Sequence, residues 1–254
     1  WHSSVTNEHY CSAIHSIKQH IQRGDTYQVN YTYRHHARFS GEPWTLFQQM
    51  IRAQGPGYGA YINIPDWCIC CASPELFFST DADTLVSKPM KGTAARAVTD
   101  CQDQQRANRL YHSAKDRAEN TMIVDMVRND MGRVARTGSV SVPYLNQIER
   151  YPTVWQMTST VTCSTRASRV EILKALYPAA SITGAPKAST MNIITDLETT
   201  PRNIYTGSIG FMSPDNRSQF NVAIRTLLWN KKSGRAEYGT GGGIVWDVTG
   251  FVAA

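Results

Sequence analysis

The 254-residue sequence lacks several features that would assign it to a common protein class. No apolar run approaches the roughly 20 residues that a membrane-spanning helix needs, and no signal peptide opens the chain. No repeat, low-complexity tract or linker divides it. With 41% hydrophobic residues, the chain can instead bury one large core.

Cysteine is too sparse for a disulfide scaffold. The Cys-Ile-Cys-Cys run at residues 68–71 also has no second ligand pair at zinc spacing. We therefore expect buried free thiols in a reducing cytosol, and hence a cytoplasmic protein. The six cysteines are Cys11, Cys68, Cys70, Cys71, Cys101 and Cys163.

The chain also lacks any block of like charge. Its net charge of +6 suits a small anionic substrate, but the basic residues are scattered. A nucleic-acid-binding surface would need basic and aromatic side chains interleaved on one face, and the tyrosine stripe at residues 27–33 is explained more simply as core. We expect no nucleic-acid partner and no membrane partner.

Hydrophobic periodicity predicts a single α+β unit in which antiparallel-type strands alternate with helices. Residues 103–134 are expected to form one long helix. The other helices are expected at residues 7–23, from Pro43, near 168–176 and after Pro186. The strands are expected near residues 27–33, 58–64, 67–72, 76–80, 139–148, 151–162, 204–212, 219–229, 235–240 and 243–247.

The segment 88–93, Lys-Pro-Met-Lys-Gly-Thr, is predicted to form a turn that holds Lys91 in place. Pro89 fixes its own φ, and Gly92 permits a sharp turn or a close approach to a ligand. A lysine at a strand end among apolar residues can have a lowered pKa, which would make Lys91 an amine nucleophile. From this hexapeptide alone, an ordinary solvated lysine is the better explanation.

Glu75 changes that balance. It lies in a Ser-Pro-Glu-x-Phe motif at residues 73–77, on the edge of an apolar and aromatic run. Desolvation there would raise the pKa of its carboxyl toward use as a general acid. The sequence thus offers a candidate acid sixteen residues before a candidate nucleophile.

Together the two motifs resemble the chorismate-utilising enzymes, and the lysine variant of the second is similar to the aminodeoxychorismate synthase component I branch. The resemblance covers nearly the whole chain. It implies a large antiparallel β-sandwich with helices packed on the outer faces. It also implies that residues 1–254 are a single chorismate-binding catalytic domain, a fragment of a longer chain that is incomplete at both ends.

Further motifs carry the resemblance residue by residue. The strand motif at residues 24–30 matches the family, but isochorismate and salicylate synthases carry a water-activating lysine at the position of Gln28. Glutamine cannot act as that base, which favours an amine-forming enzyme. The helix signature at residues 116–130 implies that Glu119 binds Mg²⁺, a cation that prefers hard oxygen ligands.

The resemblance also implies a set of substrate contacts. The loop 181–187 matches a family loop whose hydroxyl and amides, here on Thr183 and Gly184, face the substrate. Tyr205 and Arg225 correspond to residues that grip the enolpyruvyl carboxylate, a task suited to a planar guanidinium. A glycine run presents backbone N–H groups, although a triplet alone could mark a bulge. Its members are Gly241, Gly242 and Gly243.

Two departures from the family pattern stand out. Gln156 replaces a usual histidine, so this position cannot shuttle protons. The family continues after residue 247 into a helix with a second Mg²⁺ glutamate and a carboxylate-binding lysine, whereas this chain ends at Ala254. The sequence starts at Trp1 instead of Met, and the resemblance leads us to expect a further N-terminal portion that completes the family's sandwich.

The resemblance implies that Lys91 attacks C2 of chorismate while Glu75 protonates the departing C4 hydroxyl. Ammonia from a glutamine amidotransferase subunit, component II, then expels Lys91 to give 4-amino-4-deoxychorismate, the first step of p-aminobenzoate and folate synthesis. One alternative is anthranilate synthase component I, which typically has alanine at the Lys91 position. Another is a non-catalytic chorismate-binding remnant, favoured by Gln156 and the missing second metal glutamate.

Overall fold

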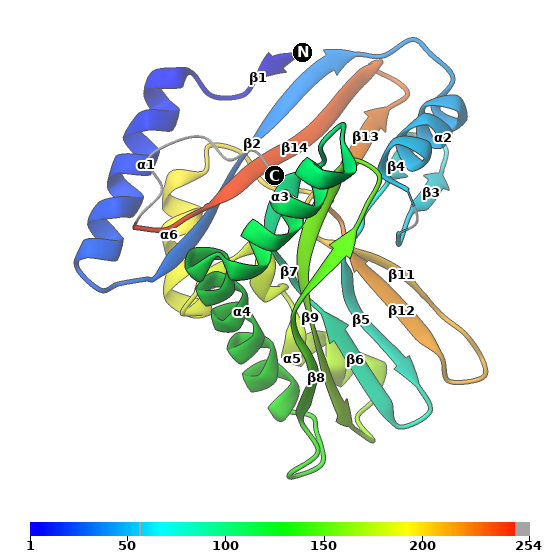
Figure 1. Ribbon diagram of the computed structural model, residues 1–254. Helices are drawn as coiled ribbons and strands as arrows, with labels where there is room; N and C mark the ends of the chain where they lie inside the picture. The colour runs from blue at the N-terminus through cyan, green and yellow to red at the C-terminus, as the bar shows by residue number, and fades with distance from the viewer. Residues whose placement is uncertain (56, 247–254) are drawn as a thin grey trace.

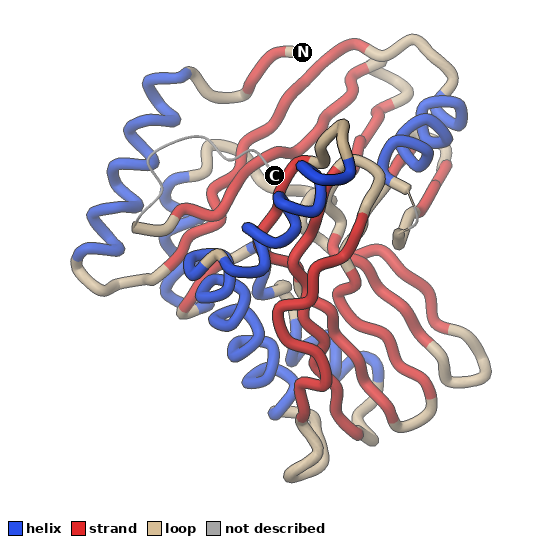
Figure 2. The backbone as a smooth tube through the Cα atoms, in the orientation of Figure 1, coloured by secondary structure: helices blue, strands red, loops and turns tan. Residues whose placement is uncertain are grey.

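The computed structural model describes residues 1–55 and 57–246, which form two seven-stranded antiparallel sheets with helices against their faces (Figures 1 and 2). The first sheet has the order β1-β2-β14-β13-β4-β3, with β10 also paired to β2. The second has the order β11-β12-β5-β6-β9-β7, with β8 also paired to β9. The expected α+β class built on antiparallel sheets is confirmed.

The first sheet contains β1 (His2–Ser3), β2 (Gln28–Arg38), β3 (Ala60–Asn63), β4 (Trp67–Cys71), β10 (Gly184–Ala185), β13 (Thr226–Asn230) and β14 (Arg235–Ile244). The second contains β5 (Leu76–Asp81), β6 (Thr84–Lys88), β7 (Met90–Ala95), β8 (Ser141–Arg150), β9 (Val154–Ser164), β11 (Ser208–Met212) and β12 (Ser218–Val222). The helices are α1 (Asn7–Gln22), α2 (Pro43–Gln54), α3 (Asp100–His112), α4 (Ala114–Gly132), α5 (Arg169–Leu176), α6 (Lys187–Leu197) and the 3-10 helix η1 (Ala180–Ile182).

Strand β2 has two buried faces of different chemistry. Its apolar face, with Val29 and Tyr31, packs against Ile17 of α1 and against α6. Because side chains alternate along a strand, the opposite face carries the polar residues at even positions 28–34, and these are also buried. Tyr27, expected in the core, is instead 66% exposed. The buried polar face of β2 becomes one wall of the candidate site.

The second sheet buries its aromatic side chains against helices. Phe77 and Phe78 of β5 and Leu85 of β6 form one cluster with Ile123 of α4 and Ile172 of α5. This packing fixes the orientation of α4, whose remaining faces are more polar. It thereby determines where the carboxylates of α4 lie relative to the second sheet.

The expected single helix at 103–134 is wrong. The chain breaks at Ser113, whose N–H donates to Leu110 O at the end of α3 and whose side chain accepts from Asp116 N at the start of α4. Serine is a preferred N-cap because its oxygen satisfies a free N–H of the first turn. An apolar stripe continues through both helices, so periodicity alone could not reveal the break.

The predicted turn at 88–93 is also wrong. Pro89 separates two strands, and Lys91 lies inside β7. The pairing of β7 with β9 shifts register between Met90 and Thr93, which indicates a bulge around Lys91 and Gly92. Gly92 has φ of 87°, a left-handed conformation that glycine adopts without steric cost. Lys91 is therefore held by a sheet and not by a surface turn.

Three C-terminal strand predictions are corrected as well. The expected strand 204–212 begins only at Ser208, and 219–229 divides into β12 and β13 because residues 223–225 cross from one sheet to the other. The segments 235–240 and 243–247 join as one strand, β14, which ends at Ile244, so residues 245 and 246 are not strand. The end of the last prediction, at residue 247, lies outside the described residues, as does Pro56.

Candidate active site

Two crossings between the sheets carry the central residues of the site. Residues 72–75 connect β4 to β5, and residues 223–225 connect β12 to β13. The crossings are tied together, since Ala72 N donates to Arg225 O at 3.0 Å and Val222 N donates to Glu75 O at 3.1 Å. Glu75 and Arg225 are thus presented from one rigid junction.

Glu75 is buried at this junction, with 4% of its surface exposed. Burial raises the pKa of its carboxyl to about 7, and the nearby Ser181 hydroxyl, Lys91 amine and Met90 N–H only partly offset that increase. No cation lies within ion-pair distance of Glu75 in the described residues. A carboxyl with a pKa near neutrality can hold a proton and release it to a substrate.

Lys91 approaches Glu75 from β7. Burial lowers the pKa of the Lys91 amine, while the charges of Glu75 and Glu119 act in the opposite direction. Its side chain is half-buried, and in the part of the chain that the structure describes it forms no ion pair within 4.0 Å. The amine therefore lies between two carboxylates without being fixed by either, as a nucleophile requires.

Gln156 holds the bulge that carries Lys91. Its Nε2 donates to Gly92 O at 2.9 Å, and its Oε1 accepts from Thr93 Oγ1 at 2.9 Å. Both ends of the amide are thus occupied by neighbours of Lys91. Gln156 thus orients the bulge in this structure.

Glycines of β14 make room along the polar face of β2. Gly239 and Gly241 share one face of β14 with Gly243, whereas Gly242 points to the opposite, buried face. A Cβ at Gly239 would overlap the Tyr205 ring, and one at Gly241 would overlap the backbone of β2. Of the three predicted glycines, two therefore face this side and one does not.

Gln28 lies at the Lys91 end of these glycines. A Cβ at Gly243 would lie 2.9 Å from Gln28 Nε2 and 3.6 Å from Lys91 Nζ, so these three residues converge. Gln28 is fully buried, and neither its Nε2 nor its Oε1 has a hydrogen-bond partner among the described residues. A buried amide without a partner is costly, which indicates that a ligand or water completes it.

Thr183 and Gly184 occupy the back of the site. The Thr183 hydroxyl donates to Ala179 O at 3.1 Å and to Ala180 O at 3.3 Å, so its proton is already engaged. Gly184 pairs with Val29 at φ of 152°, and a Cβ there would overlap Gln28 O. In the described structure, these two residues fix the strand that bears Gln28.

Tyr205 and Arg225 each have other partners in the described residues. The Tyr205 ring is buried under the Arg34 guanidinium, which lies 5.1 Å from the ring centroid. Arg225 donates to Gln54 Oε1, and burial lowers its pKa. Tyr238 lies near both, close enough that its charge affects the pKa of each. The prediction that Tyr205 and Arg225 share one carboxylate stays a prediction.

Glu119 extends from α4 toward Lys91. Burial raises the pKa of its carboxyl, and its nearest ion-pair partner is Lys115 at 4.0 Å. No group of three or more His, Cys, Asp or Glu side chains that could hold a metal occurs in residues 1–55 and 57–246. A single hard carboxylate still suits Mg²⁺, which commonly takes its remaining ligands from water and substrate oxygens.

Sequence reasoning missed three residues near this site. Ser181 begins the matched loop and lies beside Glu75, whereas Tyr151 and Tyr238 flank Arg225. Only Ser181 had a usable signal, as the first residue of a motif. Tyr238 comes from β14, which pairs with β13 next to Arg225, whereas Tyr151 lies between β8 and β9 of the other sheet. No local pattern in the sequence displays either proximity.

All six cysteines are free, as expected. Four are buried, but Cys11 and Cys101 are exposed, so the expectation of buried thiols holds only in part. None of the described helices is long and apolar enough to cross a membrane.

Comparisons with known proteins agree on one family. A family model described as chorismate binding enzyme matches residues 1–249. Aminodeoxychorismate synthase component 1 from Escherichia coli is 40% identical over 97% of this chain and 54% of its own length. An anthranilate synthase component 1 from Haloarcula marismortui is 36% identical over 91% of this chain and 46% of its own length.

A solved structure agrees with the fold. Anthranilate synthase component I from Streptococcus pneumoniae superimposes with a TM-score of 0.89 at 28% identity, over 97% of this chain and 55% of that one. The chain spans about half the length of the curated relatives it matches. The activity of a complete protein is therefore a matter for proposal.

Proposed function

Since this chain belongs to the chorismate-binding enzyme family, we propose that its site aminates chorismate at C4 to give 4-amino-4-deoxychorismate. The observation that carries the proposal is the pairing of an unfixed Lys91 amine with Glu75, whose pKa is about 7. One group is suited to attack and the other to donate a proton. Similarity to aminodeoxychorismate synthase component 1 supports the same reaction.

The proposed reaction proceeds in two substitutions. Lys91 Nζ forms a bond to C2 of the ring, the ring double bonds shift, and the C4–O bond breaks as Glu75 gives its proton to the departing oxygen, which leaves as water. Ammonia then bonds to C4, the double bonds shift back, and the bond between C2 and Lys91 breaks. The covalent intermediate divides one difficult allylic substitution into two easier steps.

Gln28 favours amination over hydration of the ring. A hydrating enzyme needs a base at this wall of the site to activate water, and a glutamine amide cannot accept a proton at neutral pH. Its unpartnered Nε2 and Oε1 are instead available to hold a polar atom of the substrate beside Lys91. Gln28 thus supports the proposal that the site aminates the ring and does not hydrate it.

Mg²⁺ and an ammonia source complete the proposal. Glu119 would hold Mg²⁺, which when bound neutralises and orients the ring carboxylate of the substrate. Arg225 would take the second carboxylate, since a guanidinium matches its planar geometry. A glutamine amidotransferase partner would supply ammonia, consistent with the designation of the E. coli relative as component 1.

Intact-protein mass spectrometry after incubation with chorismate, Mg²⁺ and ammonium, with chromatography of the products, tests this function. We expect aminodeoxychorismate, and an adduct mapped to Lys91 when ammonium is omitted. The Lys91→Ala variant should form neither. An adduct in that variant would refute the assignment of Lys91 as the nucleophile. Anthranilate as the product would show that the protein acts as an anthranilate synthase instead.

A further inference from the structure

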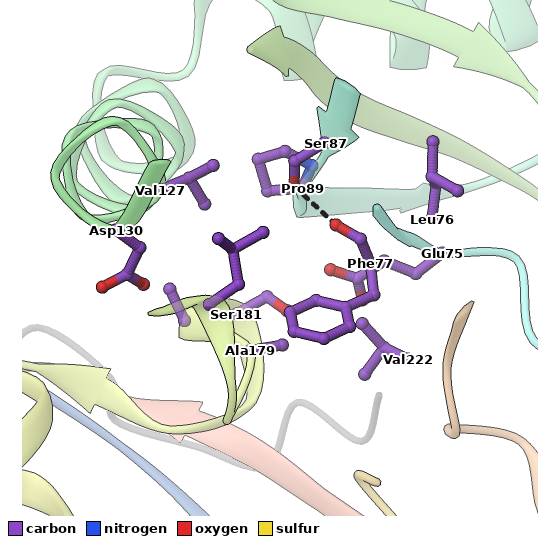
Figure 3. A pocket seen from close by; sticks show the side chains of 12 residues that line it. Glu75, Leu76, Phe77, Ser87, Pro89, Val127, Asp130, Ala179, Ser181 and Val222 are labelled. Atoms are coloured by element: carbon purple, nitrogen blue, oxygen red, sulfur yellow. Dashed lines mark hydrogen bonds between the residues drawn. The ribbon is translucent and has the colours of Figure 1, made fainter. Parts of the chain in front are cut away.

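A small cavity is lined by Glu75 together with residues of β5, α4 and η1. The volume open to the centre of a water molecule is about 20 Å³. A cavity needs roughly 10–15 Å³ of this volume to hold one water. Figure 3 shows Glu75 and Ser181 on one side of this space, with Val127 and Asp130 of α4 on the other. The cavity therefore joins the candidate acid to a second carboxylate from a different element.

Ser181 contributes a buried hydroxyl to the lining of the cavity. Its side chain is 6% exposed, and it lies close enough to Glu75 to lower the pKa of that carboxyl. Its buried Oγ nevertheless forms no hydrogen bond of standard geometry with any described residue. Buried hydroxyls are normally paired, and waters that pair them typically bond to two or more polar groups.

Asp130 lines both the cavity beside Glu75 and a second, larger pocket. It lies on the inner cavity and also on an open groove of about 860 Å³ between α4 and the segments of Asn146 and Pro186. Lys187 Nζ donates to its Oδ2 at 2.5 Å, whereas its Oδ1 accepts no hydrogen bond from residues 1–55 or 57–246. One oxygen is thus anchored and the other is available to water.

We propose that a water in this cavity, held by Ser181, links Glu75 to Asp130 and returns protons to Glu75 from the outer groove. This inference rests on the proposed function of Glu75 as the acid. In that reaction the C4 oxygen leaves as water with the proton of Glu75, so each turnover leaves a carboxylate behind. When the product leaves as an ammonium ion, a solvent proton must replace the one lost.

The charges around the relay permit this transfer. Asp130 faces Lys187 and Arg133, and burial nevertheless raises the pKa of its carboxyl, which eases transient protonation. Glu75 faces Lys91 and Arg225. A proton that enters at Asp130 thus passes through one water to Glu75, and the substrate side of Glu75 can stay closed to bulk water during the reaction.

A pair of matched variants separates the water from the residues around it. Ala179→Val adds two methyl groups to the cavity lining, whereas Ala175→Val adds the same groups to the same apolar cluster away from the cavity. Difference infrared spectroscopy over a pH titration measures the pKa of the Glu75 carboxyl directly and needs no turnover. The band of Glu75 is assigned by its loss in Glu75→Gln. Ala179→Val should give Glu75 a pKa about one pH unit higher, because expelling water removes a hydrogen bond to the carboxylate. Ala175→Val should leave it unchanged.

The kinetic arm uses Asp130→Asn, which keeps an oxygen for Lys187 but cannot carry a proton. If the protein aminates chorismate, this variant and Ala179→Val should reduce kcat at least tenfold, with a larger loss at higher pH and an unchanged KM. Equal titration of Glu75 in Ala179→Val and Ala175→Val would overturn the proposal, as would unaltered kcat in Asp130→Asn. Absence of amination by the unaltered protein would refute the proposed function. The titration of Glu75 in the two alanine variants would then still show whether the cavity holds the proposed water.

Discussion

Two buried carboxylates in this molecule have opposite surroundings. Asp103 on α3 is 5% exposed and Glu75 is 4% exposed. Asp103 accepts hydrogen bonds from Arg96 Nε at 2.8 and 2.9 Å, from Ala97 N at 2.9 Å and from Trp155 Nε1 at 2.9 Å. Glu75 has a neighbouring hydroxyl and a neighbouring N–H, but no cation at contact distance among the described residues.

The difference shows how the surroundings of a structural carboxylate differ from those of the carboxylate that we propose as the acid. The Arg96 guanidinium and the donors around it hold the pKa of Asp103 well below its usual range. Desolvation without such compensation raises the pKa of Glu75 to about 7. Both residues expose little surface, so the exposed fraction alone identifies neither role. The free proton-binding capacity of Glu75 is what marks it as a site residue.

The largest expected effect comes from exchanging each carboxylate for its amide. Glu75→Gln should reduce kcat for chorismate amination by roughly 10²–10⁴-fold, because the amide cannot protonate the C4 hydroxyl. Asp103→Asn should keep kcat near the unaltered value but lower the midpoint of thermal unfolding, because Arg96 loses its charged partner. Steady-state kinetics and calorimetry on the two variants measure both quantities.

Each variant serves as the control for the other. Glu75→Gln should unfold at the same temperature as the unaltered protein or higher, since it removes an undercompensated acid. The comparison would fail if Asp103→Asn lost activity while fully folded, or if Glu75→Gln retained activity.

An intermediate effect is expected in the pH dependence of stability. Because the folded pKa of Glu75 is about 7 and the ordinary pKa of a glutamate is 4.5, Glu75 stabilises the fold most fully below pH 4.5. That contribution is lost as pH rises through 7, and the difference of about 2.5 pH units corresponds to about 3 kcal/mol. Asp103 acts in the opposite direction, because its folded pKa is lowered. Its contribution to the stability of the fold is present above pH 3.8 and is lost only in stronger acid.

Urea unfolding at pH 5 and pH 8 measures how the free energy of unfolding changes with pH. Glu75→Gln should be less sensitive to the change than the unaltered protein, by up to about 3 kcal/mol. Asp103→Asn should retain the sensitivity of the unaltered protein over the same range. Parallel slopes in all three proteins would contradict the assignment of a raised pKa to Glu75.

The same contrast explains what the sequence could predict. The motif at residues 73–77 and Lys91 were identified from local pattern and resemblance, and the α+β fold with antiparallel sheets followed from periodicity and the same resemblance. The raised pKa of Glu75 was also anticipated, because an acid on an apolar run is a local feature. The partners of Asp103 were not, since Trp155 is 52 positions away.

The errors share that cause. Residues 219–229 contain neither glycine nor proline, but a sheet crossing at 223–225 divides them, and Arg225 adopts φ of 51° there. The predicted turn at Lys91 became a bulged strand because Gln156, 64 positions from Gly92, holds that backbone. Propensity is local, whereas sheet pairing is decided by distant segments.

The smallest expected effect concerns the lysine three positions before Lys91. Lys88 Nζ lies 2.6 Å from Glu149 Oε1, and both side chains are more than a quarter exposed, so Lys88→Met should cost less than about 1 kcal/mol in unfolding free energy. It should also leave the chorismate adduct at Lys91 intact, because Lys88 already has a carboxylate partner. Lys91→Met should abolish the adduct and not destabilise the fold, since it removes an amine that burial disfavours and that forms no ion pair among the described residues. Peptide mapping of the adduct in both variants decides this, and an adduct on Lys88 would show that pairing does not distinguish the two lysines.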